Sequence, residues 1–406
     1  MMTRSISVFC VAGALSLCAQ ESRTGVVFAP IRDHKLETIR QELRGETKPA
    51  GKPKMQVDFA AIRAPKSLSE FTVLPHQEAV CQGLSGMCWC FSTTSFLESE
   101  AHRKGRPGLR FSVMHTVYWE YVEKAKGFVR SRGTSVFGEG SQGAAVIRAW
   151  KQHGALPASA YTGLKGEARN YDHEMTVFKE LKAYLEGVKA AGAWDEAPVV
   201  AKVRAILDRH LGAPPTKVTV DGRTMTPQEY VTQVAGLNLD DYVELVSFSD
   251  RPAWQRTEYN VPDNWWHGKE YLNVPLDDFM SAFKGAVRQG FSLAIAADMS
   301  EPGYSIGAPG LAVVPTWDIP SAFIDAAARQ FRFEDGSTTD DHGLHVVGHT
   351  RTNGQDWFLV KDSWSSAWNN DHPGYYFFHE DYVKLKVLGF MVHKDAVKGL
   401  LEKMKM

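Results

Sequence analysis

The chain has 406 residues, of which 44% are hydrophobic and 23% charged, values that are usual for a folded globular protein. Its formal net charge of −1 gives no basic excess of the kind that nucleic-acid-binding domains carry, and no acidic run indicates a solvating tail. This length suits two or three domains, or one enzyme of two lobes with an insertion, and allows a core that needs no disulfide framework.

The first 19 residues have the features of a signal peptide. Arg4 precedes an apolar stretch, residues 6–17, that is too short to span a bilayer. The small residue Ala19 suits cleavage, so we expect the chain to be exported, either to the periplasm or out of the cell. A lipid anchor on Cys18 is the weaker alternative, because the bulky Leu17 directly precedes it.

Helical patterns dominate the first half of the mature chain. Residues 20–70 are polar and weakly periodic, which indicates a lead-in segment rather than a domain. Apolar residues at helical spacing predict five helices, at residues 85–103, 113–129, 143–154 and, as a pair rich in Lys, Glu and Ala, within 171–211. We therefore predict a helical lobe over residues 71–240, with an insertion at about 170–240.

The second half is predicted to be mostly β-structure. Short β-prone runs bounded by Gly, Pro or Asn occur at residues 242–248, 292–297, 344–349, 357–361 and 375–378. One amphipathic helix, residues 276–288, interrupts them. The pattern predicts an α+β fold in which residues 241–406 form a β-rich lobe.

The strongest local signal is the segment QGLSGMCWCFS, residues 82–92. Cys88 lies near the predicted start of a helix, where the partial positive charge of the helix N-terminus favours the nucleophilic thiolate. Gln82 can place its side-chain amide beside the sulfur and, with the backbone N–H of Cys88, hold a developing oxyanion. We therefore predict a covalent nucleophile at Cys88, although a single Cys is more often a small buried core residue.

Three cysteines follow the predicted signal peptide: Cys81, Cys88 and Cys90. An odd number in an exported protein indicates at least one free thiol. Cys88 and Cys90 are too close in sequence for an easy bridge, whereas a disulfide between Cys81 and either of them stays open.

Two later motifs carry the groups that a thiolate nucleophile needs. His342, within TDDHGLHVVG, lies at the mouth of an apolar strand, from which its ring can point into a cleft. Asp362, within WFLVKDSW, ends the next strand and can accept a hydrogen bond from the far ring nitrogen, while Trp364 covers that bond from water. The order Cys, His and an orienting residue fits the general nucleophile–base–orienter arrangement.

Together these motifs resemble those of the papain-like cysteine peptidases, and most of all the bleomycin hydrolase or aminopeptidase C group. The likeness covers roughly residues 72–165 and 255–396, and it is carried by CWCFSTTSFLESE (88–100), TTDDHG (338–343) and MVHKDA (391–396). It implies a papain-like two-lobe fold, with the Cys on the helical lobe and the His and Asp on a β-barrel-like lobe. It also implies peptide-bond hydrolysis through a covalent thioester intermediate, without a cofactor.

The resemblance assigns roles to individual residues of this chain. It makes Cys88 the nucleophile, His342 the general base and Gln82 the oxyanion donor, and it puts Asp362 in the orienting position. Among substrate-binding residues it implies Gly140 and Ser141, in the motif EGSQ, and Trp364. The separation of 254 residues between Cys88 and His342 exceeds the roughly 130–150 of compact papain enzymes, and the surplus fits the predicted insertion.

The chain departs from the family pattern at three places. Asp362 replaces the usual Asn, and a carboxylate would favour the imidazolium form of His342 and so alter the pH profile. Ser141 replaces a second Gly, which puts the close approach of a substrate backbone in doubt. Only nine residues, 398–406, follow the last motif, whereas in the resembled group a longer tail enters the cleft. We therefore predict an open cleft and not a strict aminopeptidase.

Several alternatives are compatible with the sequence. The chain can be a catalytically inactive binding protein of the same fold, or a Cys-His-Asp acyltransferase in which an amine takes the place of water. A metal site drawn from Asp340, Asp341, His342, His345 and His349 is disfavoured, because His342 and His345 fall on opposite faces of a strand. The expected partner is a peptide or protein substrate, with neither nucleic acid nor a membrane span. The natural substrate and the oligomeric state do not follow from the sequence.

Overall fold

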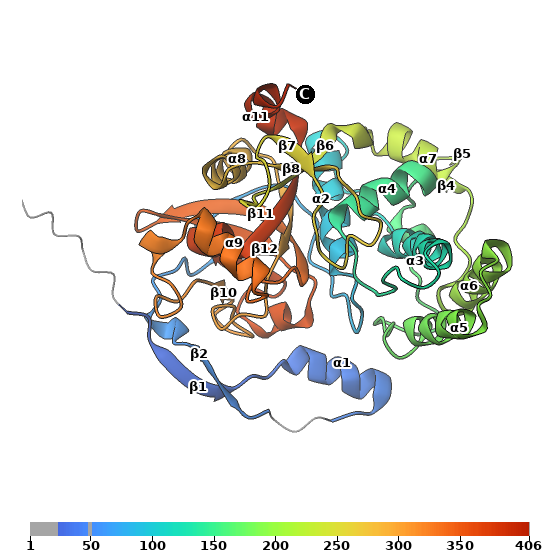
Figure 1. Cartoon of the computed structure of the whole chain (residues 1–406), viewed down its shortest axis with the longest axis horizontal. Coiled ribbons are helices and arrows are strands. Elements are labelled where there is room, and N and C mark those ends of the chain that lie inside the picture. The colour runs from blue at the N-terminus through green and yellow to red at the C-terminus, as the bar shows by residue number, and fades with distance from the viewer. Residues whose placement is uncertain (1–22, 48–50, 406) are drawn as a thin grey trace, which may run out of the picture.

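The computed structural model describes residues 23–47 and 51–405, which form a helical lobe and a β-rich lobe lying side by side (Figure 1). This is the α+β, two-lobe architecture that the sequence predicts. The predicted signal peptide, with Cys10 and Cys18, lies outside the described residues. Within the described part of the chain, every helix is too short or too polar to cross a bilayer.

The helical lobe contains the five predicted helices, with their ends within a few residues of the expected positions. They are α2 (Cys88–Arg103), α3 (Val113–Arg130), α4 (Gly143–His153), α5 (Val177–Ala191) and α6 (Glu196–Leu211). A short hairpin and one helical turn follow, formed by β4 (Val218–Val220), β5 (Arg223–Met225) and α7 (Pro227–Glu229). Helix α2 is buried along most of its length because it lies between the two lobes and packs against both.

The β-rich lobe is built on one sheet of ten strands. Along the sheet the strands run in the order β10-β13-β12-β11-β9-β14-β6-β8-β7, with β3 paired to β11. Their bounds are β3 (Thr72–Val73), β6 (Tyr242–Val246), β7 (Gln255–Thr257), β8 (Tyr271–Asn273), β9 (Leu293–Ala297), β10 (Leu311–Ala312), β11 (His342–Thr352), β12 (Gln355–Lys361), β13 (Tyr375–His379) and β14 (Val387–His393). The helices of this lobe are α8 (Leu276–Arg288), α9 (Ala326–Glu334), α10 (Glu380–Lys386) and α11 (Lys398–Lys403).

The register of β11 and β12 decides where the chemically important side chains lie. The two strands are antiparallel, and His345 of β11 pairs with Lys361 of β12. Strand β11 therefore begins, at His342, beside the end of β12, and Asp362 directly follows that end. Two residues twenty positions apart in sequence are thus brought to the same edge of the sheet.

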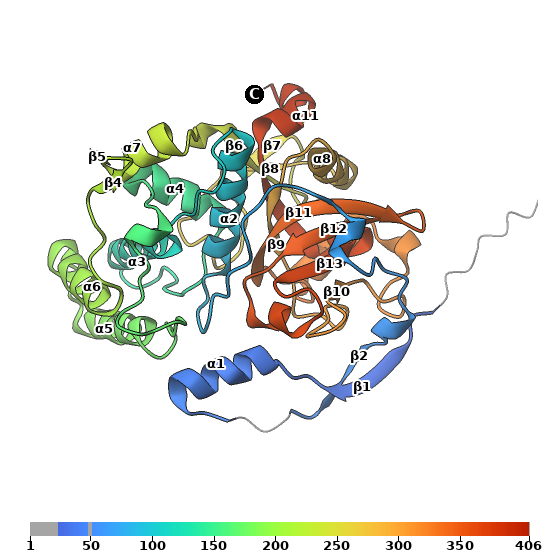
Figure 2. The same cartoon turned by 180° about the vertical axis from the view of Figure 1, so that it is seen from behind.

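The lead-in segment contains regular structure: β1 (Val26–Pro30), α1 (His34–Arg44) and β2 (Pro53–Val57), with β1 and β2 paired antiparallel. Helix α1 runs along the lower edge of the molecule in both ribbon views (Figures 1 and 2). At its start, Asp33 accepts hydrogen bonds from Ser365 Oγ at 2.6 Å and Asn369 Nδ2 at 2.8 Å, both in the β-rich lobe. At its end, Arg44 binds Asp172 of the helical lobe through two nitrogens. The segment therefore ties the two lobes together.

The C-terminal helix α11 docks on its own lobe. Leu400 is buried, and Lys403 pairs with Asp278 of α8 at 2.9 Å. Figure 1 shows the end marked C at the opposite edge of the molecule from α1. As expected from its length, the tail stays near the strand that precedes it.

Close packing of α2 on β11 depends on the absence of a side chain at Gly343. A Cβ atom there would lie 2.8 Å from Ser92 Oγ and 2.9 Å from Trp89 Cα. The second of these atoms belongs to the backbone of α2 and cannot rotate away. The glycine next to His342 therefore sets the distance between the two elements that carry Cys88 and His342.

We predict that Gly343→Ala pushes α2 away from β11. The free energy of unfolding should fall by about 1–3 kcal/mol, the usual cost of overpacking a filled core, as measured by urea denaturation. Gly285→Ala in α8 is the matched control, because its Cβ would meet nothing closer than Gln289 Nε2 at 3.7 Å. That variant should be neutral or more stable by about 0.5–1 kcal/mol. Equal effects of the two substitutions would contradict the packing argument.

Candidate active site

Cys88 is the first residue of α2 and is only half-buried. Its backbone N–H, at the open end of the helix, makes no hydrogen bond to any residue that the structure describes. The positive end of the helix dipole therefore faces the Cys88 sulfur, and a free N–H lies beside it. This position suits a thiolate nucleophile.

A short hydrogen bond joins His342 and Asp362. Nε2 of His342 lies 2.6 Å from Oδ1 of Asp362, and both side chains are buried. The same Oδ1 accepts the backbone N–H of Trp364 at 2.8 Å, and Oδ2 accepts the hydroxyl of Tyr304 at 2.9 Å. The carboxylate is thus held on three sides, and it fixes the imidazole ring so that Nδ1 remains available on the other side.

The charges around His342 favour its protonated form. Burial alone would lower its pKa, but the negative charges of Asp362 and Cys88, and the hydrogen bonds to both, outweigh burial and hold the pKa well above its usual value. A protonated imidazole next to Cys88 stabilises a thiolate–imidazolium pair. The carboxylate that replaces the usual Asn thus acts in the direction that the sequence predicts.

Gln82 is positioned through Ser363, the residue after Asp362. Ser363 Oγ donates to Gln82 Oε1 at 2.7 Å, and the backbone N–H of Gln82 donates to the carbonyl of Ser363 at 2.8 Å. One amide hydrogen of Gln82 goes to the carbonyl of Ser85 at 2.6 Å, which leaves the second without an assigned acceptor. Gln82, the predicted oxyanion donor, is therefore held by the residue that directly follows Asp362, the predicted orienting residue.

The segment around Gly140 is held from behind by a buried lysine. Lys124 Nζ donates to the carbonyl of Gly138 at 2.8 Å and also to that of Gly140. Ser141 turns its hydroxyl to Glu120 of α3 at 2.8 Å and is 4% exposed, so its side chain does not stand in the way of a ligand backbone.

Cys88 and His342 line one common pocket, together with Ser141 and the start of α4. Gly140 directly precedes Ser141 in the chain. The half-buried Trp364 donates its backbone N–H to Asp362. Of the residues singled out from sequence, the structure brings Cys88, His342, Asp362 and Gln82 into one connected arrangement. Tyr304, Ser363, Lys124 and Glu120 support it, but no local motif in the sequence marks them.

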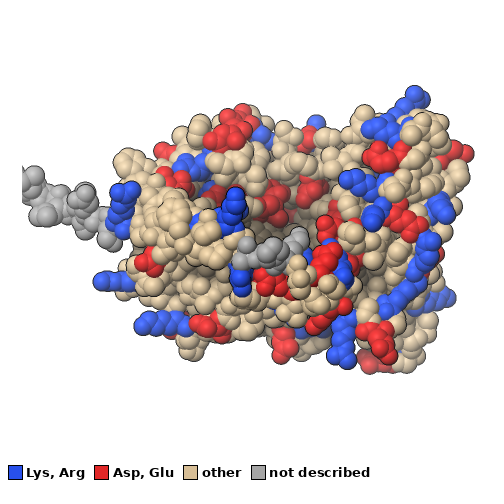
Figure 3. All heavy atoms as spheres, turned by 90° about the horizontal axis from the view of Figure 1, so that it is seen from below, with Lys and Arg blue, Asp and Glu red and all other residues tan. Residues whose placement is uncertain are grey.

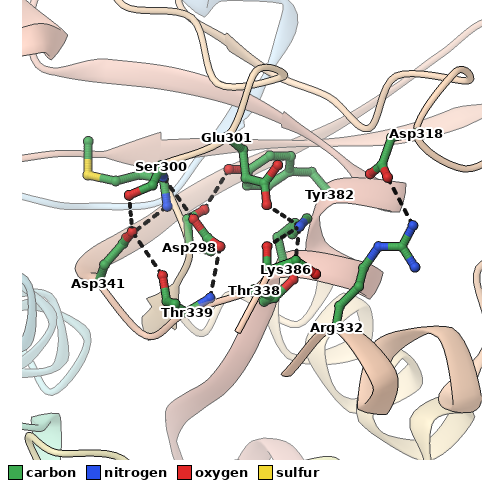
Figure 4. Close-up of polar contacts among 12 residues, drawn as sticks. Asp298, Ser300, Glu301, Asp318, Arg332, Thr338, Thr339, Asp341, Tyr382 and Lys386 are labelled. Atoms are coloured by element: carbon green, nitrogen blue, oxygen red, sulfur yellow. Dashed lines mark hydrogen bonds and ion pairs between the residues drawn. The ribbon is translucent and has the colours of Figure 1, made fainter. Parts of the chain in front are cut away.

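The loop before His342 is fixed by a polar network (Figure 4). Asp298 accepts the backbone N–H of Thr339 at 2.8 Å, and Asp341 accepts that of Met299 at 2.9 Å. Burial, followed by the charge of Asp341, raises the pKa of Asp298 to about 7. Asp340 and Asp341 both line the pocket beside His342, and Asp341 is in addition held by this network.

The residues of the alternative metal site do not converge. His345 Nδ1 lies 2.8 Å from Ser95 Oγ, which also accepts a hydrogen bond from Lys361 Nζ, so this histidine belongs to a buried contact between the lobes. The described ranges, 23–47 and 51–405, contain no group of three or more His, Cys, Asp or Glu side chains arranged to hold a metal ion.

The three cysteines of the described chain are all free, which decides the open question about a disulfide. Cys90 is completely buried, and its burial raises the pKa of its thiol. Burial is also the main reason that the pKa of Cys81 is raised. Cys88 therefore stands apart as the half-buried thiol at a helix start.

Comparisons with known proteins show which chains and folds this protein is similar to. No family model matches the chain. Aminopeptidase C of Lactococcus lactis subsp. cremoris is 20% identical over 372 residues, covering 82% of this chain and 84% of the relative. Aminopeptidase G of Lactobacillus delbrueckii subsp. lactis is 22% identical over 367 residues, covering 80% and 82%. The crystal structure of PepW from Lactobacillus rhamnosis superposes with a TM-score of 0.67 and 18% identity, over 82% of this chain and 84% of that one.

We predict that Asp362→Asn lowers the pKa of His342 by about one unit or more, because the amide keeps an acceptor oxygen but removes the negative charge. Titration of the ring followed by ¹H–¹⁵N NMR measures the pKa directly. Since the pKa is raised in the native protein, the imidazolium of the variant should be lost at a lower pH. Tyr304→Phe, which keeps the charge and removes one hydrogen bond, should shift the pKa much less. An unchanged pKa in Asp362→Asn would contradict the electrostatic account.

Proposed function

We propose that the chain is a papain-like cysteine peptidase of the bleomycin hydrolase group that hydrolyses peptide bonds, with Cys88 as the nucleophile and His342 as the general base. The observation that carries this assignment is the buried 2.6 Å contact between His342 and Asp362 in a pocket shared with Cys88. Such a pair is what a thiol at a helix start needs in order to react at neutral pH.

Each step of the proposed reaction has a group of this chain assigned to it. The thiolate of Cys88 attacks the carbonyl carbon of the peptide bond, so that a carbon–sulfur bond forms and negative charge moves to the oxygen. The backbone N–H of Cys88 and the free amide hydrogen of Gln82 stabilise that oxyanion. His342 then gives its Nδ1 proton to the leaving amine as the carbon–nitrogen bond breaks, which leaves a thioester on Cys88.

Hydrolysis of the thioester reverses these roles. His342 removes a proton from a water molecule, which attacks the thioester carbonyl, and the carbon–sulfur bond breaks to release the carboxylic acid. The imidazolium and the thiolate are then restored. Through both halves Asp362 holds the ring in one orientation and stabilises its positive charge, while Tyr304 and the N–H of Trp364 hold Asp362.

The relatives are named aminopeptidases, which supports N-terminal residues of peptides as substrates. We propose that a free N-terminus is not strictly required. Of the described residues of α11, none lines the pocket that contains Cys88, and α11 is instead held at α8. A peptide can therefore extend past the pocket without meeting the C-terminal helix.

We predict that iodoacetamide at low concentration and pH 6 alkylates Cys88 before the other cysteines, because only its thiol is both accessible and paired with an imidazolium. Peptide mapping by mass spectrometry locates the adduct. Cys88→Ala should abolish covalent turnover of peptides and leave only weak residual catalysis. Cys81→Ala is the control and should keep both turnover and labelling. Preferential labelling of Cys81 or Cys90 would overturn the assignment.

We also propose export of the protein, supported by Arg4 and the apolar residues 6–17 of the sequence. N-terminal sequencing of the protein from its native host should find a chain that begins near residue 20. An intact Met1 on protein from the cytosol would contradict export, and a lipid on Cys18 would correct only the mode of anchoring.

A further inference from the structure

The pocket that contains Cys88 and His342 continues into a wall of carboxylates. Glu244 of β6, Asp263 and Asp340 line it together with Tyr259 and Tyr271. We call this part, defined by these five residues, the acidic pocket. Three segments far apart in sequence thus place carboxyl groups in the pocket that contains Cys88.

None of the three carboxyl groups forms an ion pair with a cation among the described residues, although the charge of Lys124 acts on Asp263. Asp340 accepts hydrogen bonds from two neutral groups, Gln142 Nε2 at 2.5 Å and the Tyr259 hydroxyl, and Glu244 accepts one from the backbone of Ala144. The nearby cations are already used, since Lys124 binds backbone carbonyls. Likewise, Arg148 pairs with Glu120 at 2.6 Å.

Two tyrosines add polar groups to the same wall. Tyr259 and Tyr271 are each 1% exposed; the hydroxyl of Tyr259 contacts Asp340, whereas that of Tyr271 has no hydrogen-bond partner among the described residues. A buried hydroxyl without a partner costs free energy unless a ligand satisfies it. Burial raises the pKa of both tyrosines, and the charge of Asp340 adds to the rise for Tyr259 as that of Glu244 does for Tyr271. Each hydroxyl therefore lies near a carboxyl group. The wall therefore offers hydrogen-bonding groups and negative charge to one ligand.

The raised pKa values of Glu244 and Asp340 agree with the absence of a positive charge that would compensate them. Burial, followed by the charges of Glu270 and Asp340, raises the pKa of Glu244 to about 8. Burial, followed by the charge of Asp263, raises the pKa of Asp340 to about 7. A cation bound between them would lower both pKa values, so its binding is coupled to the release of protons from the two carboxyl groups.

Asp263 connects the acidic pocket with the segment that faces a substrate backbone. Its Oδ2 lies 2.2 Å from where a Cβ of Gly140 would be, so the carboxylate rests directly against this glycine. At larger scale, acidic side chains also gather in and around the hollow between the lobes (Figure 3). A positively charged peptide is therefore attracted toward the cleft as well as held within it.

We propose that the acidic pocket binds a cationic group of the peptide substrate, either its α-ammonium or the side chain of Lys or Arg. The proposal rests on the proposed peptidase function and adds the substrate class. An ammonium, with three N–H donors, or a guanidinium, with five, can donate to Glu244, Asp340 and the Tyr271 hydroxyl. The carboxylates are spread along the wall rather than grouped around a point, which fits an organic cation better than a metal ion.

Equilibrium binding tests the pocket independently of catalysis. The full-length Cys88→Ala variant is titrated by calorimetry at pH 7 and physiological salt with three amide-capped peptides: N-acetylated trinorleucine, free-amine trinorleucine and N-acetylated trilysine. One cationic peptide should bind about tenfold or more tightly than the neutral one, as expected for a charge pair within a few ångströms. Tighter binding of free-amine trinorleucine identifies the α-ammonium as the ligand, and tighter binding of trilysine identifies a side chain. Equal binding of all three, or none, overturns the proposal.

Isosteric variants locate the effect. In the Cys88→Ala background, Glu244→Gln and Asp340→Asn keep the shape and one acceptor oxygen of each side chain and should each remove most of the preference for the cationic peptide. Glu186→Gln, an exposed residue of α5 with the same loss of charge, should leave the preference unchanged. A loss as large in Glu186→Gln would overturn the proposal, because the preference would then reflect net charge alone.

Turnover separates this proposal from the proposed function. With Cys88 present, kcat/KM for the same three peptides should show the same order, and the ratio of cationic to neutral substrate should fall about tenfold in Glu244→Gln. Charge-selective binding without hydrolysis of any peptide would mean that the pocket stands and the peptidase function fails. Hydrolysis without charge preference would mean that the peptidase function stands and the proposed role of the acidic pocket fails.

Discussion

The hydrogen bond between His342 and Asp362 is the interaction on which the rest of the site depends. It exists because β11 and β12 are antiparallel, so that the first residue of one strand lies beside the residue that follows the other. The backbone around Asp362 then does further work, since Ser363 holds Gln82 and the N–H of Trp364 holds the carboxylate. A change in this strand register would disperse the base, its orienting group and the oxyanion donor together.

The nucleophile belongs to the other lobe, and its placement is a matter of packing. Helix α2 can reach the sheet only because Gly343 has no side chain, and Trp89 Nε1 ties the helix to the carbonyl of Glu139 in the segment beside the cleft. Helix α1 adds a second tie between the lobes through Asp33 and Arg44. The distance between Cys88 and His342 is thus fixed by contacts made on both sides of the cleft.

Two kinds of buried carboxylate lie within this small region, and their surroundings differ. Asp362 has a hydrogen-bond donor on every side and faces an imidazolium, so its charge is compensated within the protein. Glu244 and Asp340 lack such compensation, and both have strongly raised pKa values. A buried charge that the protein leaves uncompensated costs free energy. The surroundings of Asp362 therefore suit its proposed role in orienting His342, and those of Glu244 and Asp340 suit a ligand that brings its own positive charge.

The sequence by itself determined the α+β class, the five helices of the first half and helix α8, and it singled out Cys88, His342 and Asp362, which the structure brings together. These follow from local periodicity and from short motifs, which need no knowledge of distant contacts. It did not reveal β14, α9 or α10, or the regular structure within residues 23–57, because short or uniformly buried segments carry little periodic signal. Only the tertiary structure decided that Tyr304 completes the shell of Asp362, that all three cysteines stay free, and that Glu244, Asp263 and Asp340 meet beside Cys88. Each of these depends on side chains brought together from segments far apart in sequence, and a single sequence records no such contact.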